Sequence, residues 1–314
     1  MKNEYCIAFY NLENLFDTTD DPHTLDDDFT PKGFKKWKDN RYRSKLNKLA
    51  KAISKIGEED ADQPPVLIGV AEVENSKVLR KLLKTKYLED FPYDFVHFDS
   101  PDERGIDTAL IYNTEFFEPL HTETIPLLIV DEDGDRDYTR DILMVRGKLN
   151  GEEITVFVNH WPSRRDGAKE TEQKRITAAQ TILDKIALVK NYGVADNFII
   201  MGDFNDDPNS TSIQTLMDSG MFINPSKKLL SPFSGSANYK GEWTLFDQIL
   251  ISHSFLNHEP GTHTFEKASI FAPKFLREWK GKYKGNPFRT FAGKKYIGGY
   301  SDHFPVYVVL ELND

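Results

Sequence analysis

The sequence contains very little cysteine and no long apolar run, and each absence limits what the chain can be. Its one cysteine, Cys6, cannot form an internal disulfide, which fits a reducing compartment and equally a secreted protein whose leader has been removed. No apolar stretch approaches the ~20 residues that a membrane-spanning helix needs, and the opening MKNEYCIAFY turns polar before a signal-peptide core could form. We therefore expect a soluble chain without stable membrane association, in a compartment that the sequence leaves unknown.

Basic residues are also fewer than acidic residues. The chain carries 40 Lys and Arg against 50 Asp and Glu, a net charge of −10. An acidic surface repels the phosphates of nucleic acid unless bases are locally concentrated, so the charge disfavours a protein that coats DNA through salt-dependent contacts. It does not exclude an enzyme that holds one phosphate at a time, because a few bases and a metal ion outweigh a diffuse, screened field.

The sequence does contain enough apolar material for a large core. Hydrophobic residues make up 39% and aromatic residues 12% of the 314 residues, which argues against a disordered or fibrous chain. Length alone allows one domain or two. Predicted strands recur to both ends without a linker-like change in composition, an internal repeat or a low-complexity tract, so we expect a single domain spanning residues 1–314.

Hydrophobic periodicity predicts both strands and helices. Short apolar runs and alternating patterns predict strands at residues 5–10, 93–98, 108–112, 118–130, 142–149, 154–159, 198–201, 245–251 and 304–310, and a buried strand in PPVLIGVAEV that ends near Glu72. NGEE at 150–153 predicts a hairpin turn. Three-and-four spacing predicts helices at 39–56 and 171–189, with shorter ones at 77–83 and from about Ser210. The mixture indicates an α/β (α+β) chain in which helices cover sheets.

Polar residues stand at the ends of several predicted strands. Each of them alone is an ordinary turn, cap or solvated residue, and only their joint pattern indicates a site. The set comprises Asn11, Glu72, His160, Asp203 with Asn205, Asp247, and the pair Asp302 and His303.

These residue types match the needs of phosphoester hydrolysis, which are a hard cation with oxygen ligands, an activated water and donors for the transition-state oxygens. Asn11 and Glu13 would share one face if the first strand continues, and Glu72 leaves a buried strand. Carboxylate and amide oxygens of this kind suit Mg²⁺, whereas the sequence has no cluster of cysteine and histidine that would indicate zinc.

The motif GDFN delivers a second polar pair. Asp203 and Asn205 point the same way in a locally extended chain, while Phe204 turns back towards the core and Gly202 lets the backbone approach closely. The two acids that follow, at positions 206 and 207, are assigned to a solvent-exposed turn.

Two histidines complete the set. His160 and His303 can each donate to a phosphoryl oxygen or move a proton near neutral pH. We expect Asp247 to orient His303. Asp107 is a weaker candidate for orienting His160 and can equally be a residue that starts a strand.

The ordered series YNLENLF, GVAEVEN, RGIDTALIYN, VNHWPSR, GDFND, FDQILIS and YSDHFPV resembles the endonuclease/exonuclease/phosphatase superfamily, which includes deoxyribonuclease I, abasic-site endonucleases, sphingomyelinases and inositol-polyphosphate phosphatases. The resemblance covers almost the whole chain, and GDFN followed by SDHFPV is its most specific part. It implies one domain of two packed mixed β-sheets flanked by helices, a four-layer sandwich with its site at one end of the sheets.

The resemblance also implies a role for each polar residue. For the metal it implies Asn11 and Glu72 as site residues, with Asp302 beside the ion or holding its water. For catalysis it implies Asp203 as the group that orients or deprotonates the attacking water, Asn205 as a phosphate contact, His160 and His303 on either side of the scissile phosphate, and Asp247 paired with His303. Arg140, in YTRDILMV, resembles the arginine that some nuclease members place on a substrate phosphate, although TRD is also ordinary edge-strand charge.

The sequence departs from the family pattern in two places. HWPSR differs from the shorter histidine motif of deoxyribonuclease I, and residues 274–296 interleave aromatics with bases. Such a segment can stack the bases and hold the phosphates of a nucleic acid, or it can be a surface insertion whose aromatics pack on the sheet, which is the favoured interpretation.

These observations predict a Mg²⁺-dependent phosphoesterase, with Mn²⁺ as a substitute ion, that acts as a monomer on a phosphodiester by in-line attack of water. DNA or RNA is the leading substrate. A phosphatase or a lipid phosphodiesterase of the inositol-phosphate or sphingomyelin type is the alternative, because catalytic motifs report the bond better than what is attached to it. A non-catalytic binding module is disfavoured, since every acid, amide and histidine that the chemistry needs is present.

Overall fold

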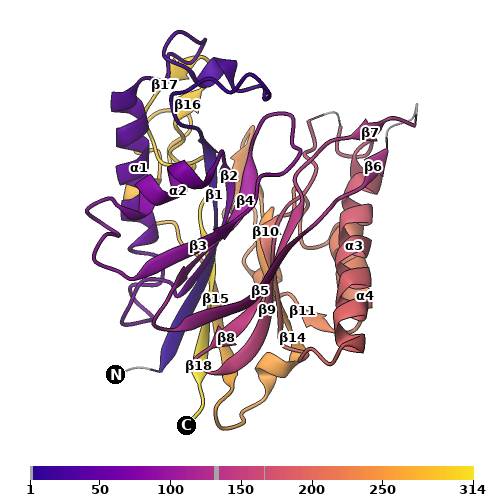
Figure 1. Ribbon diagram of the computed structural model, residues 1–314. Coiled ribbons are helices and arrows are strands. Elements are labelled where there is room, and N and C mark those ends of the chain that lie inside the picture. Colours follow the sequence, from indigo (N-terminus) through magenta and orange to yellow (C-terminus); the bar gives the residue numbers. More distant parts are fainter. Residues whose placement is uncertain (1–2, 131–133, 166) are drawn as a thin grey trace.

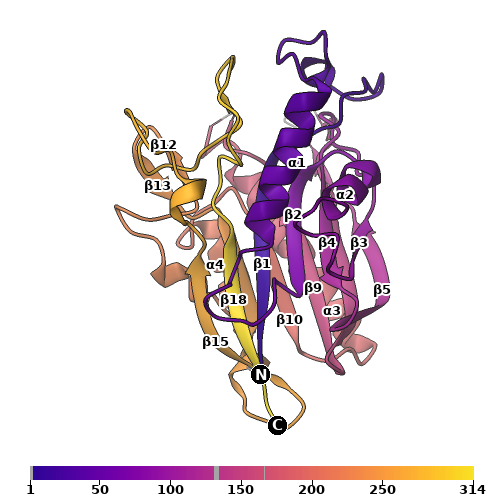
Figure 2. The same cartoon turned by 90° about the vertical axis from the view of Figure 1, so that its left-hand side faces the viewer.

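Two mixed β-sheets pack face to face, and helices cover their outer faces. The computed structural model describes residues 3–130, 134–165 and 167–314. Each main sheet has six strands, in the order β15-β18-β1-β2-β4-β3 for the first sheet and β11-β14-β10-β9-β8-β5 for the second. In Figure 1 helices α1 and α2 lie outside the first sheet and α3 and α4 outside the second, and Figure 2 shows α1 crossing the outer face of the first sheet. This is the four-layer arrangement predicted from the sequence, and that prediction is confirmed.

The strands of the first sheet are β1 Glu4–Leu15, β2 Leu67–Val73, β3 Tyr93–His97, β4 Asp107–Asn113, β15 His263–Ile270 and β18 Val306–Leu312. Those of the second are β5 Phe117–Ile125, β8 Ile142–Leu149, β9 Glu152–His160, β10 Phe198–Asp203, β11 Phe222–Ile223 and β14 Asp247–Ser252. Three small hairpins pair β6 Ile129–Val130 with β7 Arg136–Asp137, β12 Ala237–Tyr239 with β13 Glu242–Thr244, and β16 Phe291–Ala292 with β17 Lys295–Tyr296. The α-helices are α1 Asp39–Ile53, α2 Ser76–Leu83, α3 Glu172–Asn191 and α4 Thr211–Asp218, with short 3-10 turns at Asp27–Phe29, Pro225–Lys228, His253–Leu256 and Lys274–Leu276.

Alternation along the inner strands divides the apolar side chains among three cores. In β1, Ala8 and Tyr10 join the core under α1 and α2, while Phe9 points into the core between the sheets. In β10, Met201 points between the sheets and Ile200 joins the core under α3 and α4. Because both faces of these strands are covered, each reads as a continuous apolar run in the sequence. The core that the two sheets share agrees with the predicted single domain, which stays a prediction.

Two sequence predictions need correction at the edges of the sheets, and one strand was missed. The strand predicted at 118–130 is wrong beyond Ile125: Pro126 interrupts it, and residues 129–130 pair with β7 outside the main sheet. Strand β1 continues past the predicted end at Tyr10 as far as Leu15. The edge strand β15, whose residues are largely half-buried or exposed, was not predicted, because its polar composition carries little apolar signal. The NGEE turn is confirmed, with positive φ at Asn150 and Gly151.

Strand direction gathers the polar strand ends at one edge of the molecule. Strands β1 and β2 run parallel, as do β9 and β10, so within each sheet their carboxyl ends share an edge. Strands β18 and β14 run antiparallel to β1 and β10, so their amino ends lie at that same edge. We call this edge, where the ends from both sheets meet, the site edge.

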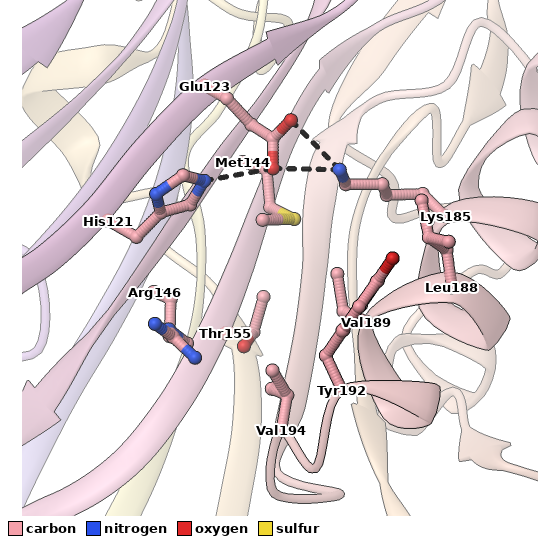
Figure 3. A pocket seen from close by; sticks show the side chains of 10 residues that line it. All are labelled: His121, Glu123, Met144, Arg146, Thr155, Lys185, Leu188, Val189, Tyr192 and Val194. Atoms are coloured by element: carbon pink, nitrogen blue, oxygen red, sulfur yellow. Dashed lines mark hydrogen bonds and ion pairs between the residues drawn. The ribbon is translucent and has the colours of Figure 1, made fainter.

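A hollow of about 210 Å³ lies away from the site edge, between the outer face of the second sheet and the C-terminal half of α3 (Figure 3). Across it Lys185 of α3 forms an ion pair with Glu123 of β5 at 2.8 Å, which attaches the helix to the edge of the sheet. None of the predicted site residues lines this hollow. None of the helices within the described ranges has the length and apolar character needed to cross a membrane.

Gly202 lets β9 and β10 approach closely just before the site edge. A Cβ at this position would lie 2.5 Å from the carbonyl oxygen of Asn159 on β9. That atom belongs to the backbone and cannot rotate away, so any larger residue must push the two strands apart.

We expect Gly202→Ala to lower the free energy of unfolding by about 1–3 kcal/mol, the usual cost of overpacking a well-packed interior. Urea denaturation measures the change. Ala187→Ser, which adds one atom at an exposed position of α3, serves as the control and should stay within about 0.5 kcal/mol of wild type. A Gly202→Ala protein as stable as the control would contradict the close approach.

Candidate active site

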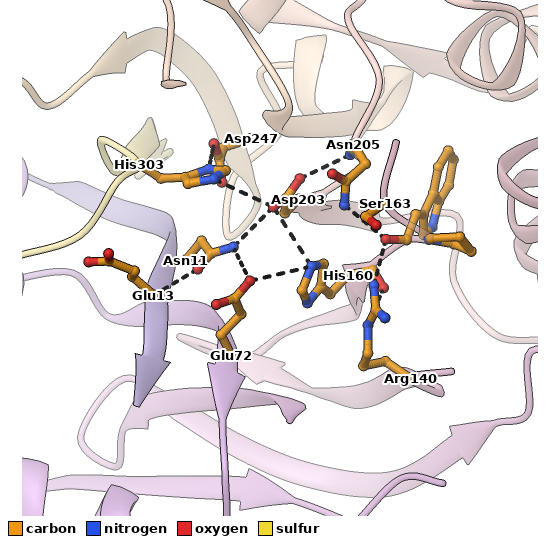
Figure 4. Close-up of polar contacts among 12 residues, drawn as sticks. Asn11, Glu13, Glu72, Arg140, His160, Ser163, Asp203, Asn205, Asp247 and His303 are labelled. Atoms are coloured by element: carbon orange, nitrogen blue, oxygen red, sulfur yellow. Dashed lines mark hydrogen bonds and ion pairs between the residues drawn. The ribbon is translucent and has the colours of Figure 1, made fainter. Parts of the chain in front are cut away.

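Three of the predicted residues stand in a row across the second sheet. His160 is directly opposite Asp203 in the pairing of β9 with β10, and Asp203 is directly opposite Asp247 in the pairing of β10 with β14. Opposed residues in neighbouring strands project from the same face of a sheet. The register of the sheet therefore brings a histidine and two carboxylates together from positions far apart in the sequence (Figure 4).

Asn11 connects this row to the first sheet. Its Nδ2 donates to Oδ2 of Asp203 at 3.0 Å and to Oε1 of Glu72 at 3.4 Å. Asn11 is 1% exposed and Asp203 is 2% exposed, so the contact is shielded from water. The two sheets thus meet at the site edge through one amide and two carboxylates.

The orientation of the Asn11 amide differs from the expected oxygen ligand. Its Oδ1 accepts the backbone N–H of Glu13 at 2.9 Å, so the NH₂ group faces the carboxylates. The expectation that Glu13 shares this face is wrong, because Glu13 has φ +50° and the strand does not continue in regular form. The Glu13 carboxylate turns instead to the backbone N–H of Thr290 at 2.6 Å and to Lys45 Nζ at 3.4 Å.

Glu72 is held in an unusual backbone conformation. Its φ of +63° lies in the left-handed region, which a glutamate adopts only at an energetic cost. The carboxylate accepts the backbone N–H of Asn14 at 2.8 Å, and the β1–β2 register is irregular at this point. The strained backbone aims the Glu72 carboxylate towards Asn11 and His160, a pattern typical of functional sites.

His303 and Asp247 form the expected pair. Nδ1 of His303 lies 2.6 Å from Oδ2 of Asp247, and Nε2 lies 3.9 Å from Oδ2 of Asp203. Burial acts to lower the pKa of His303, but the carboxylates of Asp247 and Asp203 outweigh it and raise that pKa well above the usual histidine value. His303 is therefore the charged histidine of the site.

His160 is the neutral one. Its Nε2 lies 3.9 Å from both Glu72 Oε1 and Asp203 Oδ2. Burial, and then the positive charges of Arg140, Arg104 and His303, lower its pKa well below the usual value. Two histidines on either side of one aspartate thus carry different charges, because His303 is paired with Asp247 whereas burial, and then the nearby guanidinium of Arg140, lower the pKa of His160.

Asp107 does not orient His160, so that expectation is wrong. Its Oδ2 lies 3.0 Å from Nε2 of His97 and its Oδ1 accepts the backbone N–H of Ser100 at 2.8 Å. It is the first residue of β4, as the alternative interpretation had it.

The chain leaves the extended form directly after Asp203, so the locally extended conformation predicted for GDFN is wrong at Asn205. Asn205 has φ +50° and donates its backbone N–H to Oδ1 of Asp203 at 2.9 Å. Its Nδ2 donates to the carbonyl oxygen of Trp161 at 2.9 Å. Phe204 points into the core, where it meets the Trp161 ring edge-on at 4.7 Å. The turn therefore fixes Asp203 and anchors the segment after His160 at once.

The guanidinium of Arg140 is bonded to other residues of the protein. It is 6% exposed, and its guanidinium donates to Asp102 Oδ2 at 2.9 Å and to the carbonyl oxygens of His160 at 3.2 Å and Trp161 at 2.7 Å. These contacts favour a role in holding the His160 segment over the expected contact with a substrate phosphate. Asp102 was not singled out in the sequence, where an aspartate after Pro101 reads as a turn residue.

The acids after GDFN are not left to solvent, so that expectation is wrong. Asp206 is 3% exposed and forms ion pairs with Arg164 at 2.6 Å and Arg175 at 2.7 Å. Asp207 accepts the backbone N–H of Leu245 at 2.7 Å. Both acids hold the turn to α3 and to the strand that begins at Asp247.

The segment before His303 is tied to α1 and β1. Lys45, 1% exposed, donates to the hydroxyl of Thr290 at 2.6 Å and to the carbonyl oxygen of Tyr300 at 2.7 Å. Ser301 donates its hydroxyl to the carbonyl oxygen of Asn11 at 2.6 Å. Asp302 is half-buried here and contributes to raising the pKa of His303, after Asp247 and Asp203. Lys45 was missed in the sequence because it lies in a run of bases that resembles a solvated helix face.

Some side chains of residues 274–296 pack against the core, and others are exposed. Phe275, Phe288, Phe291 and Tyr296 pack against the core under α1, as the insertion interpretation predicts. Trp279 is 66% exposed.

Oxygen donors dominate the centre of the site. Asp203, Asp247 and His303 offer ligand atoms that all lie within 4.8 Å of one another, and the Glu72 carboxylate lies beside them across Asn11. A mainly carboxylate set of this kind fits a hard divalent cation rather than a soft one. The same centre holds one cationic and one neutral histidine, which can donate to a bound anion.

A mixed four-layer sandwich with such a centre at the end of its sheets defines a class of phosphoester hydrolases. The chain belongs to the endonuclease/exonuclease/phosphatase family, whose model matches residues 6–312. Members of this family are hydrolases that act on phosphoester bonds, and they generally use divalent metals.

Solved structures share this fold at low sequence identity. An endonuclease/exonuclease/phosphatase family protein from Bacteroides thetaiotaomicron is 17% identical with a TM-score of 0.63, over 99% of this chain and 95% of that one. A humanized TDP2 from D. rerio is 14% identical with a TM-score of 0.60, over 98% and 99%. A mannosyl-6-phosphatase from B. thetaiotaomicron is 18% identical with a TM-score of 0.59, over 98% and 99%. No curated protein matches the chain in sequence.

A half-buried carboxylate beside the site gives a prediction about pH. Burial raises the pKa of Glu74, two residues after Glu72, to about 7. Because the folded state then binds this proton more tightly than the unfolded state, the carboxyl makes the free energy of unfolding fall as the pH rises from about 4.5 to about 7.

Glu74→Gln should therefore reduce the loss of stability between about pH 5 and about pH 7, since an amide does not titrate. Urea denaturation of the chelator-treated protein at the two pH values measures it. Glu59→Gln, at an exposed position, should leave the pH dependence unchanged. An unaltered pH dependence in Glu74→Gln would contradict the raised pKa.

Proposed function

We propose that the protein is a Mg²⁺-dependent phosphodiesterase whose substrate is a nucleic acid, with Mn²⁺ as a substitute ion. The observation that carries the proposal is the arrangement around Asp203. A buried carboxylate stands between a cationic histidine and a neutral one, each with its Nε2 at 3.9 Å from Oδ2. A base between two donors suits the attack of water on a phosphate.

The residues present fit a magnesium ion. Glu72 is the carboxylate that would hold it, with Asp302 at the periphery, and oxygen ligands of this kind are what Mg²⁺ requires. Asn11 presents its NH₂ to Asp203 at 3.0 Å and to Glu72 at 3.4 Å, so we assign it to positioning these two carboxylates. When bound, the ion supplies positive charge that polarises the phosphate and stabilises developing negative charge.

Asp203 acts on the attacking water. Burial raises its pKa to about 6, with His303 opposing and Asp247 adding to the rise, so the carboxylate is ionised at neutral pH and still basic. Hydrogen bonds from Asn11 and from the backbone of Asn205 fix its two oxygens. A carboxylate with this pKa and this orientation can accept a proton from water near neutral pH.

The two histidines act on the phosphate. His303, held as a cation by Asp247, can donate a hydrogen bond or a proton from Nε2 to a phosphoryl or leaving oxygen. His160, neutral and fixed through Arg140, can donate a hydrogen bond from Nε2 without adding charge. Asn205 is the candidate contact to a non-bridging oxygen, because its Nδ2 carries two N–H groups and the bond to the Trp161 carbonyl oxygen uses one of them.

A phosphatase or lipid phosphodiesterase remains the alternative, because the same centre serves other esters. Among similar structures, one is named a mannosyl-6-phosphatase and another is a D. rerio TDP2 complexed with single strand DNA product. A substrate panel separates the alternatives: linear and nicked DNA, RNA, a chromogenic phosphodiester, a phosphomonoester, inositol phosphates and sphingomyelin, each with Mg²⁺, Mn²⁺ or chelator. Turnover of monoesters alone would overturn the diester assignment, and no turnover of any substrate would overturn the enzyme.

Asp203→Ala is expected to lower kcat on the chromogenic diester by about 10²–10⁴-fold, the typical contribution of a positioned acid or base. The fold should persist, which circular dichroism checks. Asp218→Ala removes an exposed carboxylate from the end of α4 and should retain wild-type kcat. Near-normal turnover by Asp203→Ala would remove Asp203 from the mechanism.

Glu72→Gln is expected to weaken Mg²⁺ binding. Because an ion that binds only the folded state raises its stability, Mg²⁺ should raise the Tm of wild type in proportion to its affinity, and the rise should be smaller in Glu72→Gln. Thermal unfolding across a Mg²⁺ titration measures this without an activity assay. Equal Tm shifts in the two proteins would place the ion elsewhere.

A further inference from the structure

Four aromatic side chains stand exposed on two loops that border His303. Phe233 and Tyr239 belong to residues 231–244, where they are 89% and 68% exposed. Trp279 and Tyr283 belong to residues 277–287, where they are 66% and 54% exposed. We call these four residues the aromatic rim. Large exposed rings gathered on two adjacent loops indicate a contact surface.

The first loop is bonded to the catalytic residues themselves. Ala237 forms a β-bridge with His303, and the backbone N–H of Phe304 donates to the carbonyl oxygen of Ser236 at 2.7 Å. The hydroxyl of Ser236 accepts the backbone N–H of Asp247 at 3.2 Å. The rim is therefore anchored to both members of the Asp247 and His303 pair.

The second loop is attached to the first. Asn286 donates its side-chain amide to Asn238 Oδ1 at 3.0 Å. Below this contact the ring of Phe304 stacks against Trp243 at 6.0 Å, and the guanidinium of Arg277 lies 6.0 Å from the Phe304 ring. In Figure 2 the β12–β13 hairpin projects beyond the ends of the sheets, on the side of β18. Both loops thus form one continuous border on the His303 side of the site.

Three of the rim aromatics each have a lysine ammonium group close to the ring. Lys240 Nζ lies 5.0 Å from the Tyr239 ring, Lys280 4.2 Å from Trp279 and Lys282 5.6 Å from Tyr283. Residues 274–296 hold one acid, Glu278, among their bases, which are Lys274, Arg277, Lys280, Lys282, Lys284, Arg289, Lys294 and Lys295. On a chain of net charge −10, this is the local concentration of bases that binding to a polyanion requires.

We propose that the aromatic rim binds a single-stranded segment of nucleic acid that continues from the scissile phosphate past His303. The rings stack on successive unpaired bases, and the lysines beside them neutralise the intervening phosphates. An unpaired strand is required because the bases of a duplex are stacked on one another and offer no free face. The inference rests on the proposed function, since it extends the substrate of the same site.

A lipid surface is the competing occupant of exposed aromatics. The large exposed hydrophobic residues of the two loops, all of which lie in the described part of the chain, are aromatic and none is aliphatic. Ammonium groups at 4.2 to 5.6 Å from three of the rings would have to lose their hydration on entering a membrane. Aromatic rings paired with cations fit stacked bases and phosphates better than acyl chains.

The test compares binding with small-substrate turnover. Wild type and the triple variant Tyr239→Ala, Trp279→Ala, Tyr283→Ala are titrated against a fluorescent twelve-nucleotide oligothymidine in chelator, and both are assayed with the chromogenic diester and Mg²⁺. Stacking losses of the usual size weaken binding by about tenfold per ring, so a loss of roughly 100-fold or more is expected. Turnover of the chromogenic diester should stay within about twofold of wild type, because no rim residue is assigned to the chemistry.

Controls separate the rim from a general effect. Tyr192→Ala removes a ring that is 81% exposed at the end of α3, remote from the site edge, and should bind the oligonucleotide like wild type. Lys280→Gln should flatten the salt dependence of binding by about 0.7 in log Kd against log salt, the value for one phosphate contact on a single strand. A 16-base-pair duplex should bind wild type more weakly than the single strand.

Three results would overturn the inference: no binding of the oligonucleotide by wild type, equal affinities of wild type and the triple variant, or a triple variant that keeps the oligonucleotide but loses binding to vesicles of phosphatidylcholine and phosphatidylserine. The last would assign the rim to a membrane. Failure of the proposed function looks different, because there the chromogenic diester is not turned over by any variant, whatever the oligonucleotide does.

Discussion

The hydrogen bonds of the Asn11 amide hold the site together, because they are where the two sheets meet. One NH₂ group donates to a carboxylate of each sheet, and the oxygen of the same amide is occupied by the backbone N–H of Glu13. Two carboxylates brought this close would repel each other without a donor between them. The Asn11 amide, at the irregular end of β1, therefore sets the distance between the Glu72 and Asp203 carboxylates.

The charges of the two histidines follow from the burial and the neighbouring charges of each ring. Asp247 lies beside Nδ1 of His303 and raises the pKa of that ring, whereas burial, and then the charge of the Arg140 guanidinium that donates to the His160 carbonyl oxygen, lower the pKa of His160. Burial and the two partner residues, Asp247 for His303 and Arg140 for His160, therefore set the protonation of the site. The pair can offer one charged and one neutral donor at the same pH.

The sequence predicts the strand ends well because burial on both faces leaves a continuous apolar run that stops where the polar residue begins. It predicts poorly the partners that meet only after folding. Asp206 looks like a turn acid, since its partners Arg164 and Arg175 lie more than 30 positions away in another layer. Lys45 looks solvated for the same reason: Thr290 and Tyr300 close over it from the far end of the chain.

The position of β18 has a consequence for synthesis. This strand lies between the edge strand β15 and β1 in the first sheet, and the segment that leads into it brings His303 to a site that also contains Asn11. A nascent chain that has emerged only as far as β17 lacks both His303 and the strand β18 that follows it. Hydrolytic activity can therefore arise only after the longest-range pairing in the molecule, that of β1 with β18, has formed, so partly made chains on the ribosome lack it.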